Sequence, residues 1–146
     1  MKDTDIAVDY LLAGRSCAQA ILMAYGPRFG MDRETASRLA AGFAGGMFRG
    51  DTCGAVSAAV MVAGLAYGSP DSGERYTASY CTLVTQEFCH RFCLRQKSVE
   101  CRQILERHHV DPKDPEQIRG LRASGICTAV VRDAQEILDA LLEEEL

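Results

Sequence analysis

The sequence predicts a single all-α domain of about five to six helices. Apolar residues recur at intervals of three and four along almost the whole chain, which is the period of an amphipathic helix. No segment shows the strict alternation of a half-buried strand, and no internal repeat or clear boundary divides the chain. A length of 146 residues suits one domain, here residues 1–146, with its own hydrophobic core.

The first half of the chain predicts three helices. An apolar stripe runs through residues 6–24, and Gly14 is expected to bend or split it. A second helix is expected over residues 32–44, opened by an aspartate cap. Residues 42–50 hold four glycines and predict a loop with tight backbone conformations. The central helix should follow this loop, over residues 53–67.

The second half predicts a long helix, a short helix and a final helix. The longest is expected over residues 73–95, and the short one over residues 99–108 with Ser98 as its cap. Residues 109–125 carry two prolines and two glycines, which predicts a loop with about one helical turn. The last helix is expected over residues 127–143.

Charge and hydropathy exclude several classes of protein. The net charge of −4 disfavours binding to nucleic acid or to an anionic membrane. The longest nearly unbroken apolar stretch, residues 58–67, is shorter than the roughly 20 residues that a membrane span needs. The acidic N-terminal sequence lacks the apolar segment of a signal peptide, so the cytoplasm is the expected compartment.

Cysteine content is the chemically distinctive feature of the chain. There are seven: Cys17, Cys53, Cys81, Cys89, Cys93, Cys101 and Cys127. An odd number without an export signal argues against a disulfide framework. In a reducing compartment, clustered cysteines more often bind a metal or carry out redox chemistry. The alternative for each one is a role as a small buried hydrophobic residue.

Four cysteines lie where helices are expected to begin. Serine-led sequences precede Cys17, Cys101 and Cys127, and the pair Asp51-Thr52 precedes Cys53, all of which are typical of N-caps. A helix N-terminus carries unpaired N–H groups and a partial positive charge, which favour the thiolate and lower a cysteine pKa. All but Cys101 also lie on an apolar stripe. Their side chains are therefore expected to point inward, where they can converge on one site.

The remaining candidate ligands favour structural roles. Cys81 is expected to fill the core of the longest helix. Cys89 and Cys93 are four residues apart on one helix face and fit partly buried positions better than half of a metal site. His108 and His109 chelate poorly together, because adjacent helical residues point about 100° apart.

Two interpretations of the glycine-rich segment stay open. The segment lacks the G-K-[ST] ending of a phosphate loop, so nucleotide binding is disfavoured. Gly45 and Gly46 either let two helices pack closely or let the backbone approach an anion, a metal centre or a redox partner beside Cys53. In the second interpretation, Arg49 lowers the pKa of the Cys53 thiol further.

Four parts of the sequence also match a known family. They are residues 14–20, residues 42–47 with the Cys-Gly-Ala-Val-Ser-Ala sequence of residues 53–58, residues 98–102, and Cys127. In these parts the chain resembles the bacterial and archaeal C_GCAxxG_C_C proteins, which are described as redox-active. The match runs over nearly the whole chain. It departs from the family motif at Ala58, where the motif has glycine, so a looser helix contact is expected there.

The resemblance implies an α-helical protein with a redox role, often encoded near transporter genes. The family's four cysteines map onto Cys17, Cys53, Cys101 and Cys127. The family supplies no substrate. The expected partner is a redox partner or a transporter-associated protein, and a homodimer is compatible with either.

Three functions are compatible with these residues. In the leading one, thiol–disulfide exchange or electron relay, Cys53 reacts first, Cys17 resolves it, and Cys101 with Cys127 forms a second pair. In the second, the same four thiolates hold zinc or an iron–sulfur cluster, although no C-x-x-C motif is present. In the third, the chain is a non-catalytic accessory module of a transporter or a redox partner.

Overall fold

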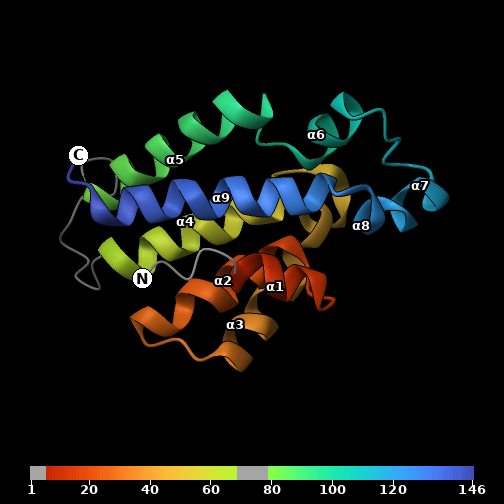
Figure 1. Cartoon of the computed structure of the whole chain (residues 1–146). Coiled ribbons are helices and arrows are strands. Elements are labelled where there is room, and N and C mark those ends of the chain that lie inside the picture. The colour runs from red at the N-terminus through yellow and green to blue at the C-terminus, as the bar shows by residue number, and fades with distance from the viewer. Residues whose placement is uncertain (1–5, 69–78) are drawn as a thin grey trace.

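The structure is a computed structural model that describes residues 6–68 and 79–146 (Figure 1). The described residues are helical almost throughout and contain no strand, which confirms the all-α prediction. The α-helices are α1 (Ile6–Leu12), α2 (Cys17–Tyr25), α3 (Arg33–Ala40), α4 (Gly54–Tyr67), α5 (Tyr80–Gln96), α6 (Cys101–Arg107), α7 (Pro115–Arg119), α8 (Leu121–Ser124) and α9 (Ile126–Glu143). Two 3₁₀ segments (Gly26–Phe29 and Ala41–Phe43) and a tight turn with left-handed residues (Gly46–Gly50) complete the set.

The long helices α4, α5 and α9 form one side of the molecule, and α1, α2 and α3 form the other (Figure 1). Helix α2 packs against α1, α3, α4 and α9, and α4 also packs against α5 and α9. The buried side chains between them form one continuous core, with Leu22, Val62, Phe92, Val131 and Leu141 at no exposure. Helices α6, α7 and α8 gather at one end of this bundle, beside the start of α9 (Figure 1).

Local sequence explains where the N-terminal helices begin. The φ of Gly14 is 113°, so α1 and α2 are separate helices, as expected for the split at this glycine. The capping box predicted at the start of α2 is present: Ser16 Oγ accepts from the Gln19 N–H at 3.2 Å, and Gln19 Oε1 accepts from the Ser16 N–H at 3.1 Å. Asp32 caps α3 by accepting from the Thr35 N–H at 2.7 Å.

Two predicted helix boundaries are wrong, one by four residues and the other by two. Helix α3 ends at Ala40 instead of residue 44, because the chain tightens into a 3₁₀ turn and becomes extended at Ala44. Helix α6 begins at Cys101 instead of residue 99. The Ser98 hydroxyl accepts from the Glu100 N–H at 2.9 Å, which closes a short turn before the helix and leaves α6 without a side-chain cap.

The C-terminal half also differs in its detail. Helix α5 begins at Tyr80, so α9, with 18 residues, is longer than α5, with 17. Residues 73–78, which the sequence placed in the longest helix, lie outside the described residues. The expected loop at residues 109–125 contains two short helices, α7 and α8. Asp114 caps α7 by accepting from the Glu116 N–H at 2.9 Å.

No helix among the described residues combines the length and the apolar composition that crossing a membrane requires.

Candidate functional site

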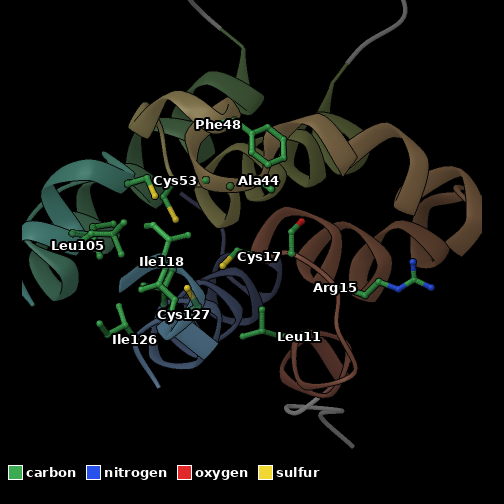
Figure 2. A pocket seen from close by; sticks show the side chains of 17 residues that line it. Leu11, Arg15, Cys17, Ala44, Phe48, Cys53, Leu105, Ile118, Ile126 and Cys127 are labelled. Atoms are coloured by element: carbon green, nitrogen blue, oxygen red, sulfur yellow. The ribbon is translucent and has the colours of Figure 1, made fainter. Parts of the chain in front are cut away.

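The four cysteines at helix starts line one cavity. Its volume is about 300 Å³, and Cys17, Cys53, Cys101 and Cys127 all contribute to its wall. They come from the first residue of α2, the residue before α4, the first residue of α6 and the second residue of α9. Figure 2 shows the sulfurs of Cys17, Cys53 and Cys127 pointing toward one another. Most of the other wall residues are apolar: Leu11, Ile104, Leu105, Ile118, Leu121, Ile126 and Val130.

Backbone hydrogen bonds hold Cys53 beside Cys101. The Cys53 N–H donates to the Val99 carbonyl at 2.7 Å, and the Cys101 N–H donates to the Asp51 carbonyl at 2.7 Å. Between these bonds, Thr52 and Glu100 form an isolated antiparallel bridge. We call residues 51–53 and 99–101 the backbone clasp. Because the clasp joins the chain just before α4 to the chain just before α6, it fixes two of the four cysteines relative to each other.

A glycine contact brings the start of α2 against the start of α4. A Cβ atom added to Gly54 would lie 2.9 Å from the Phe43 carbonyl oxygen and 3.1 Å from the Ala18 Cβ. Both distances are shorter than ordinary van der Waals contact. Glycine is therefore needed at this position for Cys17, next to Ala18, to approach Cys53, next to Gly54.

A hydrogen bond joins Cys17 and Cys127 inside the cavity. The Cys17 thiol is hydrogen-bonded to Cys127, and this bond raises the pKa of Cys17 well above its usual value by favouring the protonated form. Burial and the neighbouring Cys53 and Cys101 sulfurs raise the Cys17 pKa further. The pair expected from the sequence, Cys17 with Cys53, is therefore not the pair joined by a hydrogen bond.

The prediction of lowered thiol pKa values is wrong for Cys17, Cys53 and Cys101. Burial raises the pKa of Cys53, which is 5% exposed, to about 12. The backbone N–H groups of Ala55 and Val56 at the start of α4 act in the predicted direction, but burial outweighs them. Burial also raises the pKa of Cys101, and the neighbouring Cys127 adds to this effect. The cavity therefore holds these thiols in their neutral form at neutral pH.

Arg49 does not line the cysteine cavity. Its guanidinium pairs with the Asp51 carboxylate at 3.3 Å, and its side chain is 76% exposed. The expected contribution of Arg49 to the Cys53 pKa is therefore not supported, since burial dominates that pKa.

The two loop glycines have different positions. Gly45 lines the cavity. Gly46 has a φ of 63°, and a Cβ there would lie 2.5 Å from the Asp51 backbone nitrogen and oxygen. The Asp51 N–H donates to the Gly46 carbonyl at 3.1 Å, and the Asp51 carbonyl in turn accepts from Cys101. Gly46 therefore supports the backbone clasp.

Phe48 is a cavity residue that the sequence analysis missed. It lines the cysteine cavity, yet it is 77% exposed. Phe48 and its neighbour Met47 have φ values of 55° and 59°, a left-handed conformation that is uncommon for residues other than glycine. The signal available in the sequence was two large apolar residues inside a glycine-rich segment. Their exposure depends on the fold.

The other candidate ligands lie outside this cavity. Cys81, Cys89 and Cys93 are on α5 and are partly buried, and Cys81 and Cys89 pack against the core. His108 and His109 are exposed at the end of α6. None of the seven cysteines forms a disulfide bond in the structure. Within residues 6–68 and 79–146, no group of three or more His, Cys, Asp or Glu side chains is placed to hold a metal ion.

A family model matches most of the chain. No curated protein and no solved structure is similar enough to the chain to match it. A family model with the description "Putative redox-active protein (C_GCAxxG_C_C)" matches residues 15–141, a range that contains every cysteine of the cavity. The chain therefore belongs to the C_GCAxxG_C_C family.

Proposed function

We propose that this protein is a thiol–disulfide redox protein that stores two electrons in the Cys17 and Cys127 thiols. The observation that carries the proposal is the hydrogen bond between these two thiols inside a cavity with two further cysteines. A thiol hydrogen-bonded to a second sulfur needs only small side-chain movements to form a disulfide. This pairing replaces the pairing of Cys17 with Cys53.

The proposed oxidation consumes one disulfide and forms another. A protein thiolate attacks a sulfur of R–S–S–R, which releases one small thiol and leaves a mixed disulfide on the protein. A second protein thiolate attacks the mixed disulfide at the protein sulfur and releases the second small thiol. Two protein thiols lose two electrons and two protons, and the two R–SH molecules gain them.

Cys127 is the best placed to act as the resolving thiol. Its charge raises the pKa of Cys17, Cys53 and Cys101, so its sulfur lies within electrostatic reach of the other three. Cys53 is less suited to react first than the sequence suggested, because it is buried and its pKa is about 12. We assign Cys53 a role inside the cavity, as a later member of a relay.

Disulfide mapping tests this proposal. The fully reduced chain is treated with one equivalent of the neutral reagent 2-hydroxyethyl disulfide, and peptides are then identified by mass spectrometry without reduction. We expect a peptide pair linked through Cys17 and Cys127. Cys127→Ser should abolish this link, and the matched control Cys81→Ser should leave it intact. A link between Cys17 and Cys53, or four cavity thiols that all stay reduced, would overturn the proposal.

The other two functions receive no specific support from the described residues. No group of three or more His, Cys, Asp or Glu side chains in the described part of the chain is placed to hold a metal ion. The identity of the redox partner stays a prediction.

A further inference from the structure

A second cavity adjoins the cysteine cavity. Its volume is about 400 Å³, and Cys101, Phe48 and Leu105 line both cavities. Among the four cavity cysteines, Cys101 is the one that also borders the second cavity. Of the four cysteines, a molecule bound in the second cavity would therefore lie against Cys101.

The second cavity has a cationic wall. Arg49, Arg102 and Lys113 line it, and no acidic side chain is among the described residues lining either cavity. This clustering contrasts with the net charge of −4 for the whole chain. An apolar cavity with a cationic side favours an amphipathic anion, whose charged end pairs with the cations while its apolar part lies against the hydrophobic wall.

The present ion pairs leave these cations available to a ligand. Arg49 pairs with Asp51 at 3.3 Å and Arg102 with Glu100 at 3.6 Å, and the arginine side chains are 76% and 49% exposed. Exposed pairs of this kind are weak, so both guanidinium groups can turn toward an anion at little cost. Lys113 forms no ion pair with any residue that the structure describes.

We propose that the second cavity binds the anionic part of a low-molecular-weight disulfide that carries carboxylates, and that Cys101 is the cysteine that attacks it. This inference rests on the proposed thiol–disulfide function and adds a substrate class and a first-reacting residue to it. The carboxylates would lie against Arg49, Arg102 and Lys113, and the S–S bond against Cys101. Phe48 and Leu105, which line both cavities, would cover the apolar part of the molecule.

The exchange then runs inward from Cys101. Cys101 loses its proton to solvent, and its thiolate attacks one sulfur of the bound disulfide. The S–S bond breaks, and the departing thiolate takes a proton. Cys127 next attacks the Cys101 sulfur of the mixed disulfide and releases the second small thiol, which forms a Cys101–Cys127 disulfide. Attack by Cys17 on Cys127 then moves the disulfide to Cys17–Cys127 and returns Cys101 to its thiol form.

Three reagents of similar size but different charge test the substrate class. The reduced full-length chain is mixed with 3,3′-dithiodipropionate, 2-hydroxyethyl disulfide or cystamine, which are anionic, neutral and cationic, and thiol loss is followed in time. We expect the anionic reagent to react about tenfold faster than the neutral one, and the cationic reagent to react more slowly than either. The faster reaction of the anionic reagent should largely disappear at about 1 M NaCl, where the Debye length is about 3 Å.

Charge-reversal variants test whether the preference for the anionic reagent depends on the cations of the second cavity. Arg102→Glu combined with Lys113→Glu should reverse the order of the anionic and cationic reagents. Arg38→Glu, on α3 and outside the lining of both cavities, is the matched control and should keep the original order. The variants carry substitutions at exposed side chains, and far-UV circular dichroism verifies that they are folded.

A trapped intermediate identifies the first-reacting cysteine. In Cys127→Ser the resolving thiol is absent, so the dithiodipropionate adduct should accumulate on Cys101. Equal rates with the three reagents, or an adduct that forms first on Cys53 or Cys89, would overturn this inference. If either of these results is obtained but the Cys17–Cys127 disulfide still forms in the unaltered chain, the proposed function stands and only the further inference fails. If no disulfide forms among the four cysteines with any reagent, the proposed function itself fails.

Discussion

The Cys17 thiol, at the first residue of α2, donates a hydrogen bond to the sulfur of Cys127, in the first turn of α9. The two residues are far apart in the sequence and on helices that pack against each other. Their contact raises the pKa of Cys17, so the Cys17 thiol is neutral in an apolar cavity. The properties of this pair lead to measurements that do not require knowledge of the natural substrate.

Removing Cys127 should make Cys17 easier to ionise. In Cys127→Ala, the hydrogen bond and the repulsion between the two sulfurs both disappear, so the Cys17 pKa should fall and its rate of alkylation by iodoacetamide at pH 8.5 should rise several-fold. Quantitative mass spectrometry of the Cys17 peptide measures the rate. Cys89→Ala, on α5, serves as the control and should leave the rate unchanged. An unchanged rate in Cys127→Ala would contradict the assigned hydrogen bond.

The raised pKa of Cys53 should make the fold sensitive to alkaline pH. In the unfolded chain the thiol ionises near pH 9, whereas in the folded chain its pKa is about 12. Between these values the unfolded state has lost a proton that the folded state keeps, so the free energy of unfolding should fall as pH rises, by about 1.4 kcal/mol per pH unit for this thiol. Below pH 9 the effect is absent.

Urea unfolding of the reduced chain from pH 7 to pH 10.5 measures this dependence. Cys53→Ala lacks the titrating group, so its stability should fall less steeply above pH 9 than that of the unaltered chain. Taking the difference between the two curves removes the contributions of Cys17 and Cys101. Parallel curves would show that burial does not hold Cys53 in its thiol form.

Gly54 should tolerate no side chain. In Gly54→Ala, the added methyl group would meet the Phe43 carbonyl oxygen at 2.9 Å and the Ala18 Cβ at 3.1 Å, so α2 and α4 must move apart. We expect a loss of about 1–3 kcal/mol in the free energy of unfolding. We also expect a smaller electrostatic effect of Cys53 on the pKa of Cys17. Gly64→Ala is the matched control in the same helix, where a Cβ has no neighbour within 4 Å. It should be neutral or stabilising by up to about 1 kcal/mol.

Gly45 and Gly46 offer a second matched comparison. Both have left-handed φ values, 59° and 63°, so alanine at either position costs about 1–2 kcal/mol of backbone strain. Gly46→Ala also places a methyl group 2.5 Å from the Asp51 backbone, whereas Gly45→Ala meets nothing within 4 Å. We therefore expect the greater loss of stability in Gly46→Ala. Because Asp51 anchors Cys101, the alkylation rate of Cys101 should change in that variant alone.

Local sequence patterns were sufficient to predict much of this arrangement. The period of the apolar residues predicts the helices, and the Ser16 capping box and the Asp32 cap are formed as expected. These signals depend on residues within one turn of each other. The four cysteines that share a cavity are the same four that stand at predicted helix starts.

The features that the sequence did not predict depend on contacts between distant segments. The sign of the Cys53 pKa shift is set by burial, which no local pattern reports, while the helix-start effect that was predicted is present but smaller. The backbone clasp joins residues 51–53 to 99–101 through hydrogen bonds that have no sequence signature. The hydrogen bond between Cys17 and Cys127 likewise follows from the packing of α2 on α9.

Cys17 lies in α2 and Cys127 lies in α9, so a disulfide between them would change how long the protein resists proteolysis. A covalent bond between these helices would enclose about 110 residues, and a loop of that size removes enough freedom from the unfolded chain to stabilise the fold by about 4–5 kcal/mol. Proteases act on transiently opened chains, so the oxidised protein should survive digestion far longer than the reduced one. Redox state would then govern how long each molecule persists as well as what it can react with.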